Sequence, residues 1–298
     1  MPQYQPECVL NAKAELGECP IWCPGEQRLY WIDIQQKHFN RFDPASGTNE
    51  RWTLPQIPGS YVLNEGGGVT IAMQDGFYRF DPGGGLGSLK KTVDAPYDTS
   101  RLRFNDGRTD RAGRYWLGSM QIDMMAHGHE GAYYCFDGKS IIQKISPVEH
   151  ANGTAFAPDG KTLYRAETTQ RKIFAYDLDT ASGTLSNERT FAIVPAELGM
   201  PDGATIDSDG GYWSALPAGP KGGSVARFTP DGKLDLVIEM PVAIVTMPAF
   251  GGPDLSTLYV TTARLERLVG LESKEESGGL FAVELPYKGV PETRFRGA

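Results

Sequence analysis

Side chains that carry oxygen ligands recur at similar distances before four aromatic residues, each of which ends a short strand-like run. Glu18, Asp106, Asn152 and Asp202 precede Trp31, Trp116, Tyr164 and Trp213 by 13, 10, 12 and 11 residues, respectively. If each run belongs to one blade of a ring, equivalent positions converge on a central axis. Carboxylate and amide oxygens that meet there would form a hard metal site, which suits Ca²⁺, Mg²⁺ or Mn²⁺ better than a structural zinc.

The elements that would position these side chains form an internal repeat. Six aligned strand anchors, 40 to 49 residues apart, are Trp31, Ile71, Trp116, Tyr164, Trp213 and Tyr259. Each anchor is followed by a second segment in which apolar and polar residues alternate, as in strands. A period in the forties with several strands per unit is typical of a β-propeller. We therefore predict an all-β fold, a six-bladed β-propeller with a central metal site, formed by a single domain over residues 1–298.

The turns and ends of the repeat support this architecture. Asp-Gly pairs beginning at 75, 137, 159, 209 and 231 are expected to be hairpin turns. Asn152-Gly153 and Asp202-Gly203 each precede an apolar run that reaches its own Asp-Gly turn, so we expect them to start an innermost strand. The extended segment 7–11 is expected to complete the last blade and close the ring, which protects exposed sheet edges. Residues 195–200 are expected to form one helical turn at most.

The composition argues against several classes of partner. The net charge of −8 disfavours nucleic acids and anionic membrane surfaces. No apolar run approaches the ~20 residues of a membrane span, and the first residues lack the pattern of a signal peptide. Four cysteines without a second close pair indicate reduced thiols rather than a zinc framework or a disulfide scaffold. We predict a cytoplasmic protein with no nucleic-acid or membrane partner.

Three of the recurring side chains, Glu18, Asn152 and Asp202, are the expected metal ligands. Pro20 fixes the chain just after Glu18 and removes a backbone donor from that place. Two carboxylates and one amide carbonyl leave coordination positions open for water and substrate, as a catalytic metal requires. On position alone, an ordinary turn role for Asn152 and Asp202 remains an alternative.

Other candidate groups are weaker. A second set of metal-ligating residue types comprises Asp123, His127, His129 and Glu130. The stretch 124–130 is interpreted as a loop near the channel mouth, with Met124 or Met125 lining the pocket. We expect His150 to be an ordinary surface or packing residue. A Gly-x-Ser-x-Gly motif is absent, which argues against an α/β-hydrolase esterase.

Segments along nearly the whole chain carry a family resemblance. They are 16–22 (LGECPIW), 103–107 (RFNDG), 113–120 (GRYWLGSM), 152–156 (NGTAF), 201–204 (PDGA), 250–260 (FGGPDLSTLYV) and 291–295 (PETRF). The chain resembles the SMP-30/gluconolactonase (regucalcin-like) family, and within it the bacterial sugar-acid lactonases. The resemblance implies a six-bladed propeller whose divalent metal is bound by Glu18, Asn152 and Asp202. It also implies substrate contacts from Arg103 and Asn105.

The sequence departs from the family pattern at three places. Asp123 stands where the family often has a glutamate that touches the sugar hydroxyls, and we expect the shorter Asp123 to make the same contact. Cys19 stands where glycine is common, and Leu102 where a polar residue is common. Both changes are expected to reshape the pocket without removing the metal.

The resemblance and the residue types together predict a metal-dependent lactonase. Its partner would be a small-molecule sugar lactone, such as glucono-, xylono-, arabinono- or galactonolactone, hydrolysed to the aldonic acid. Asp202 would bind the ion and act as the general base, while the ion polarises the lactone carbonyl. The expected cofactor is one divalent ion, first Ca²⁺, with Zn²⁺, Mn²⁺, Mg²⁺ and Fe²⁺ as alternatives. We expect a monomer or a weak homo-oligomer.

Two other functions stay open at this stage. An ester or organophosphate hydrolase on the same scaffold would share the metal. A non-catalytic calcium-binding propeller module would tolerate loss of Arg103 and Asn105, since fold alone does not decide function.

Overall fold

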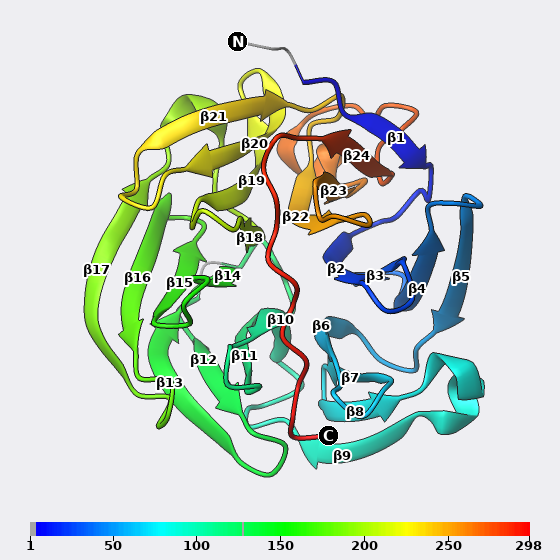
Figure 1. Ribbon diagram of the computed structural model, residues 1–298, viewed down its shortest axis with the longest axis vertical. Coiled ribbons are helices and arrows are strands. Elements are labelled where there is room, and N and C mark those ends of the chain that lie inside the picture. The colour runs from blue at the N-terminus through cyan, green and yellow to red at the C-terminus, as the bar shows by residue number, and fades with distance from the viewer. Residues whose placement is uncertain (1–3, 127) are drawn as a thin grey trace.

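The computed structural model describes residues 4–126 and 128–298. Six four-stranded antiparallel sheets are arranged in a ring around a central axis (Figure 1). The predicted six-bladed β-propeller is confirmed. In every blade the first strand of the repeat is nearest the axis, and the following strands step outwards.

The blades are numbered in chain order, each from its innermost strand. Blade one is β2 (Gly17–Cys23), β3 (Arg28–Asp33), β4 (His38–Asp43) and β5 (Thr48–Thr53). Blade two is β6 (Pro58–Leu63), β7 (Val69–Met73), β8 (Gly76–Phe80) and β9 (Lys90–Asp94). Blade three is β10 (Leu102–Thr109), β11 (Tyr115–Gln121), β12 (Gly131–Phe136) and β13 (Ile141–Val148).

The remaining blades follow the same order. Blade four is β14 (Ala151–Phe156), β15 (Thr162–Glu167), β16 (Lys172–Leu178) and β17 (Leu185–Ile193). Blade five is β18 (Ala204–Ile206), β19 (Tyr212–Gly219), β20 (Gly222–Phe228) and β21 (Leu234–Glu239). Blade six is β22 (Val245–Gly251), β23 (Thr257–Thr262), β24 (Leu280–Glu284) and, from the other end of the chain, β1 (Glu7–Leu10).

The N-terminal strand closes the ring as expected. Strand β1 pairs antiparallel with β24, Glu7 opposite Ala282 and Cys8 opposite Phe281, and so forms the outer edge of blade six. The two ends of the propeller are thereby joined in one sheet, which removes the free edge that an open array would expose. The four cysteines are all free thiols, as predicted.

The six aromatic or aliphatic anchors all lie in the second strand of their blade, and all are buried. Two of them, both tryptophans, each make the same kind of hydrogen bond to an aspartate, as the spacing of the repeat leads one to expect. The indole nitrogen of Trp116 donates to Asp110 at 2.8 Å, and that of Trp213 donates to Asp207 at 2.9 Å. Each aspartate lies six residues before its tryptophan, so the hairpin brings the carboxylate over the indole and satisfies its buried N–H.

Helical structure is limited to three short 3₁₀ segments in the part of the chain that the structure describes. They are η1 (Pro82–Ser88), η2 (Ala196–Leu198) and η3 (Glu266–Val269). Segment η2 lies where a single helical turn was expected. No helix within 4–126 or 128–298 is long and apolar enough to cross a membrane.

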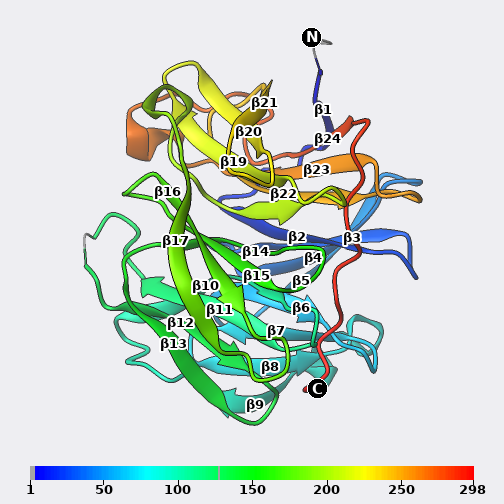
Figure 2. The same ribbon diagram turned by 60° about the vertical axis from the view of Figure 1, so that its left-hand side comes forward.

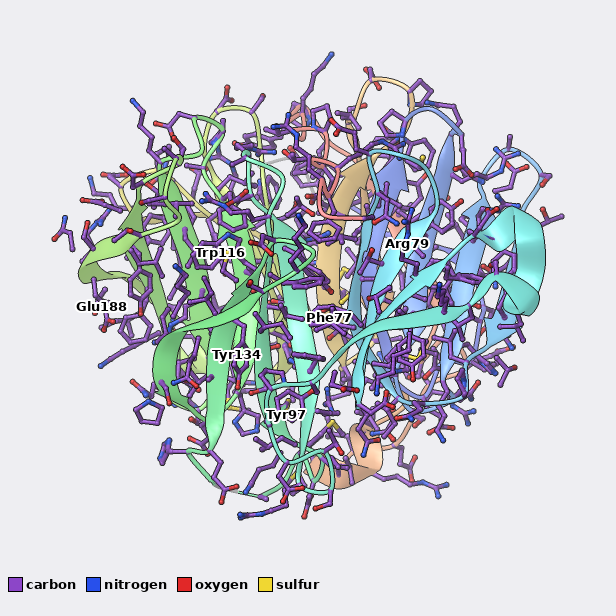
Figure 3. All side chains as sticks on the ribbon, turned by 90° about the horizontal axis from the view of Figure 1, so that it is seen from below. Phe77, Arg79, Tyr97, Trp116, Tyr134 and Glu188 are labelled. Carbon is purple, nitrogen blue, oxygen red and sulfur yellow. The ribbon has the colours of Figure 1, made fainter. Side chains whose placement is uncertain are left out.

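Neighbouring sheets lie beside one another around the axis (Figure 2), and large buried side chains pack between them. Between blades two and three, Phe77 of β8 stacks on Phe136 of β12 with ring centroids 4.1 Å apart. Phe77 and Tyr134 belong to one buried cluster and lie between the two sheets (Figure 3). Because strand faces alternate, each sheet buries one face against each neighbour, and this packing fixes the order of the inner strands around the axis.

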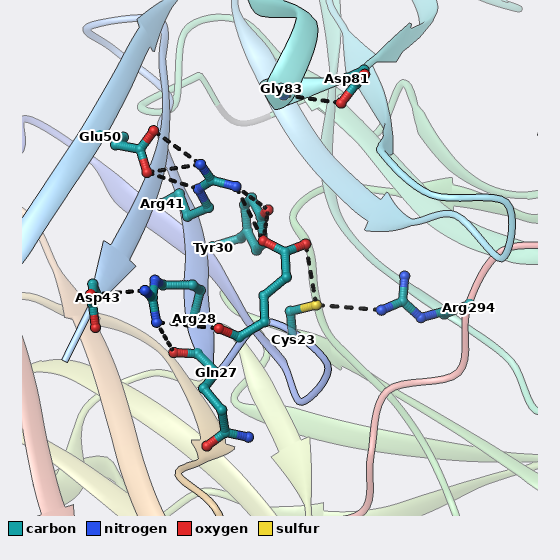
Figure 4. Close-up of polar contacts among 11 residues, drawn as sticks. Cys23, Gln27, Arg28, Tyr30, Arg41, Asp43, Glu50, Asp81, Gly83 and Arg294 are labelled. Atoms are coloured by element: carbon teal, nitrogen blue, oxygen red, sulfur yellow. Dashed lines mark hydrogen bonds and ion pairs between the residues drawn. The ribbon is translucent and has the colours of Figure 1, made fainter. Parts of the chain in front are cut away.

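The C-terminal segment 285–298 runs across the opening of the ring where the inner strands end (Figure 1). The backbone N–H of Phe295 donates to Leu63 O at 2.8 Å, and Arg294 contacts the Cys23 thiol at 3.3 Å (Figure 4). In the channel, Arg108 pairs with Glu292 at 3.2 Å and donates to Pro20 O at 3.1 Å. The tail therefore covers one end of the channel and leaves the end where the inner strands start for a ligand.

Candidate active site and metal centre

A cavity of about 290 Å³ lies at the starts of the inner strands. Its walls include Glu18, Arg103, Asn105, Asn152 and Asp202, so the structure brings together five of the predicted site residues from four different blades. A larger hollow of about 700 Å³ at the outer edge, between blades six and one, contains none of them. Convergent ionisable and amide side chains make the central cavity the candidate active site.

The same backbone irregularity presents three of these side chains. The register of the inner strand against its neighbour shifts just after Glu18, Asn105 and Asn152. The next residue in each case has a positive φ, namely 50° at Cys19, 29° at Asp106 and 62° at Gly153. Such bulges bend a strand and turn a side chain out of the regular alternation, here toward the axis. Positive φ favours glycine, which gives a physical reason for glycine where this chain has Cys19.

Arg103 and Asn105 form the centre of a buried hydrogen-bond network. One guanidinium nitrogen of Arg103 donates to Asn105 Oδ1 at 2.7 Å and to the backbone oxygen of Phe104 at 3.0 Å. The amide nitrogen of Asn105 donates to Ala151 O at 2.7 Å and to Asn152 Oδ1 at 2.8 Å. Both N–H bonds of that amide are used, so Asn105 orients Arg103 and Asn152 from its place in the cavity wall.

Asn152 is held from the other side by Thr168. The amide nitrogen of Asn152 donates to Thr168 Oγ1 at 2.8 Å, and that hydroxyl donates to Pro201 O at 2.9 Å. This chain links Asn152 of blade four to the segment that carries Asp202 in blade five. It fixes the amide so that its oxygen, rather than its nitrogen, faces Asn105 and the cavity.

Glu18, Asp202 and Asp106 interact with one another through their charges, and Arg103 and Arg108 offset this only in part. Burial raises the pKa of Glu18 well above its usual range, and the charges of Asp202 and Asp106 raise it further. Asp202 is partly exposed to the cavity, and desolvation followed by the charge of Asp106 raises its pKa as well. Burial raises the pKa of Asp106 to about 6. Burial also lowers the pKa of Arg103 to about 10, so this guanidinium stays charged at neutral pH.

These residues fit a hard divalent cation. One oxygen of the buried Asp106 carboxylate accepts from the Thr154 N–H at 2.8 Å, while its Oδ1 has no hydrogen-bond partner among the described residues. The floor of the cavity thus gathers more carboxyls than cationic groups, and the ionised form of these buried carboxyls is unfavourable unless a cation neutralises it. Glu18, Asp202 and the Asn152 carbonyl oxygen are the donors that could hold such an ion, because hard cations prefer oxygen ligands.

Asp123 lies apart from the residues just described. Its side chain is exposed, accepts from the Met125 N–H at 3.0 Å, and is not among the described residues that line the cavity. Its contact with substrate therefore remains a prediction. Met124 and Met125 from the same loop do line the cavity, as expected for a lip at the channel mouth.

The second group of candidate ligands is divided among different partners. Glu130 pairs with Arg101, and His129 lies 4.0 Å from Glu149 Oε2. His127 lies outside the described residues. A different set, Glu149, His150 and Glu167, places its ligand atoms within 4.8 Å of one another. Glu167 in that set accepts from the His150 N–H and pairs with Arg165 at 3.3 Å, so its carboxylate already serves the protein.

The chain is similar to known proteins over almost its whole length. The model of the SMP-30/Gluconolactonase/LRE-like region matches residues 16–264, which include every predicted site residue. The chain belongs to this family. A 6-deoxy-6-sulfogluconolactonase of Pseudomonas putida is 37% identical to it over 98% of both chains. Pentonolactonase XacC of Haloferax volcanii is 32% identical over 96% of both chains.

A solved family structure shows the same fold. The calcium-binding protein regucalcin from Agrobacterium tumefaciens superposes with a TM-score of 0.88 at 25% identity, covering 99% of this chain and 100% of the other. The propeller scaffold of the SMP-30/gluconolactonase/LRE-like family is therefore retained across almost the whole length of the chain.

Some residues of the site escaped the sequence analysis. His150, expected to be an ordinary packing residue, lies in the cavity wall with its ring nitrogen Nε2 3.2 Å from Met124 O. Its place two residues before Asn152 at the start of an inner strand was the available signal, because alternate residues share a face. Thr168 gave no such signal, since it is recognised only from its contacts with Asn152 and Pro201.

Proposed function

We propose that the protein is a metal-dependent lactonase that hydrolyses a sugar lactone to the aldonic acid. The observation that carries the proposal is the convergence of Glu18, Asn152, Asp202 and Arg103 on one cavity floor. The names of two relatives, a sulfogluconolactonase and a pentonolactonase, support the same reaction class. An open cavity above an oxygen-rich floor favours catalysis over a purely structural ion site.

Glu18, Asn152 and Asp202 would hold the ion, with Ca²⁺ as the first candidate. When bound, a divalent cation supplies Lewis-acid polarisation of the lactone carbonyl. Asp202 accepts a proton from the attacking water, whose oxygen forms a bond to the carbonyl carbon. The ring C–O bond then breaks and the proton passes to the former ring oxygen, which leaves a carboxylic acid and a free hydroxyl.

Arg103 supplies positive charge at the same floor. Only one of its nitrogens is engaged by Asn105 and Phe104 O in the contacts described above, so the rest of the guanidinium can donate to substrate oxygens. Its burial, with 2% of the residue exposed, keeps these donors fixed and out of bulk water. Asn105 holds the guanidinium in place, and a direct contact of Asn105 with a sugar hydroxyl is part of the proposal.

The test compares Asp202→Asn with Asp209→Asn, which changes an exposed aspartate in a turn of the same blade. Both proteins are assayed by pH-stat on gluconolactone, xylonolactone, arabinonolactone and galactonolactone after loading with Ca²⁺, Mn²⁺ or Zn²⁺. We expect Asp202→Asn to lower kcat by about 10²- to 10⁴-fold, the range for loss of a general base. Asp209→Asn should behave as the unchanged protein.

Thermal unfolding of both variants shows whether the fold is kept. Treatment with a chelator should remove activity, and addition of the divalent ion should restore it. Full activity of a metal-free preparation, or of a metal-loaded Asp202→Asn variant, would contradict the proposed mechanism. Phenyl acetate and a phosphotriester in the same assay distinguish a lactonase from a general ester or organophosphate hydrolase.

A further inference from the structure

The walls above the polar floor of the active-site cavity are mostly apolar. The side chains that form this apolar wall are Leu16, Met120, Met124, Met200, Ile244 and Leu265. They come from blades one and three and from the connections near blades five and six, so they face the cavity from several sides. Polar side chains lie mainly at the floor, and a ligand that reaches upward meets carbon and sulfur.

The apolar wall is continuous with a hydrophobic cluster of the protein. Leu16 and Ile244 are buried members of that cluster, and Met124 and Leu265 pack against it. The wall is therefore a fixed feature of the fold and not a set of isolated surface residues. Methionine side chains adapt to the shape of an apolar group, which suits a binding surface.

Most polar groups beside the apolar wall already have hydrogen-bond partners within the protein. Thr168 donates its hydroxyl proton to Pro201 O, and Thr169 donates to Glu149 at 2.8 Å. His150 Nε2 lies 3.2 Å from Met124 O, and its Nδ1 has no hydrogen-bond partner among the described residues but is buried, away from a ligand in the cavity. A sugar hydroxyl placed at this height would lose water without gaining a ready partner, which is unfavourable.

A fixed cationic group for an anionic substituent is also missing from the described upper wall. Arg103 belongs to the floor, where it is tied to Asn105. Arg264 and Arg267 line a separate hollow together with Glu15 and Glu272, whose charges oppose theirs. A neutral ligand fits these surroundings better than a sulfonate or a phosphate.

We propose that the preferred substrate is a neutral lactone whose end distant from the carbonyl is apolar, as in a 6-deoxyaldonolactone. This inference rests on the proposed lactonase function and adds the class of lactone. The polar floor would bind the carbonyl and the ring hydroxyls, and the apolar wall would cover the terminal methyl group. A cavity of about 290 Å³ is small for a ligand site and admits one such ring with a short substituent.

The experiment compares a matched pair of substrates with the metal-loaded, full-length protein. L-Fucono-1,4-lactone and L-galactono-1,4-lactone differ only in the oxygen on carbon 6. We expect kcat/KM to be about 10- to 100-fold higher for the deoxy compound, the range for an apolar pocket that meets an added hydroxyl. 6-Phosphogluconolactone should be hydrolysed more slowly than gluconolactone.

Variants then assign the preference to the wall. Leu265→Gln and Met124→Gln each place an amide in the wall at nearly unchanged size, and each should reduce the deoxy preference several-fold. Leu268→Gln is the matched control, because Leu268 lies three residues after Leu265, in η3, is 50% exposed and does not line the cavity. Thermal unfolding confirms that the variants keep the fold.

The outcomes separate this inference from the proposed function. A protein that hydrolyses L-galactono-1,4-lactone as well as the deoxy compound remains a lactonase but refutes the apolar preference. A preference that survives both wall substitutions refutes the role of the wall. Failure to hydrolyse any lactone in the presence of Ca²⁺, Mn²⁺ or Zn²⁺ would refute the proposed function and this inference with it.

Discussion

Replacement of Asp106 by asparagine tests the electrostatics of the cavity floor directly. Asp106 is 3% exposed, one of its oxygens accepts the Thr154 N–H, and the other has no partner among the described residues. Burial raises its pKa from 3.8 to about 6 in the folded protein. The folded state therefore binds a proton more tightly than the unfolded chain does, and the metal-free protein loses stability when this proton leaves.

The sign and size follow from linkage. Stability from the protonated form is fully present below about pH 4 and is lost as pH rises through about pH 6. A shift of about two pKa units corresponds to about 3 kcal/mol, of which about 2 kcal/mol is lost between pH 4.5 and pH 8. Asp106→Asn removes this loss. Its new N–H, left without a partner, costs about 1–3 kcal/mol, but that cost is the same at both pH values.

The measurement is the free energy of unfolding of the metal-free protein at pH 4.5 and pH 8. We expect the free energy of unfolding of Asp106→Asn, relative to that of the unchanged protein, to be about 2 kcal/mol higher at pH 8 than at pH 4.5. For 298 residues, an unfolding entropy of about 0.6 kcal/mol/K makes this about 3 °C in Tm. Asp209→Asn, in an exposed turn, should show no such shift.

One result would refute the reasoning. The reasoning fails if the free energies of unfolding of Asp106→Asn and the unchanged protein differ by the same amount at both pH values. Burial would then not penalise the charged form of Asp106, and this residue would add no unfavourable charge to the floor. The argument that this floor fits a divalent cation would then lose one of its three carboxyls. The same variant should also bind Ca²⁺ more weakly, because a nearby negative charge has been removed.

Three further outcomes are expected. Phe295→Ala should lower the free energy of unfolding by about 3–5 kcal/mol in a denaturant titration, because its buried phenyl ring stacks on that of Phe136 with centroids 5.5 Å apart. An unchanged midpoint would show that the C-terminal tail does not stabilise the propeller. Glu292→Gln should lower the free energy of unfolding by about 2 kcal/mol in the same titration, within the range for a hydrogen bond to a charged group, because the partly exposed Glu292 pairs with the buried Arg108. Glu65→Gln, at an exposed ion pair 3.5 Å from Arg296, should lower it by almost nothing. Ca²⁺ should raise the Tm more at about pH 8 than at about pH 5, because Glu18 and Asp202, whose pKa values are raised, must release protons to bind it; an equal rise at both values would exclude them as ligands.

Regular spacing made much of this protein predictable from its sequence. Anchors such as Trp31 and Trp213 recur because every blade needs a buried residue at the same place in its second strand. The segment that became β1 was recognised because a ring with an unpaired edge would be unstable. Glu18, Asn152 and Asp202 meet in one cavity because each occupies the same place in its repeat, so a local pattern implied a long-range contact.

Other features depend on neighbours that the repeat does not specify. Asp106 has a spacing similar to that of Glu18, but the structure makes its neighbour Asn105 the equivalent of Glu18. Asp106 is the bulge residue with a φ of 29°, and its carboxylate accepts from Thr154 of the next blade. His150 and Thr168 take their places in the site through contacts with Met124 and Asn152. None of these contacts joins residues of one strand.

The sequence by itself determined the number of blades, the closure of the ring and most of the polar floor, because these follow from periodicity within about 50 residues. Only the tertiary structure decided which apolar side chains line the cavity above that floor, and which end of the channel the C-terminal tail covers. Leu16, Met200 and Leu265 are far apart in the chain, and the tail joins the ring through contacts such as Phe295 with Leu63. Such contacts form only when the ring closes, since closure brings side chains of different blades within reach of one another.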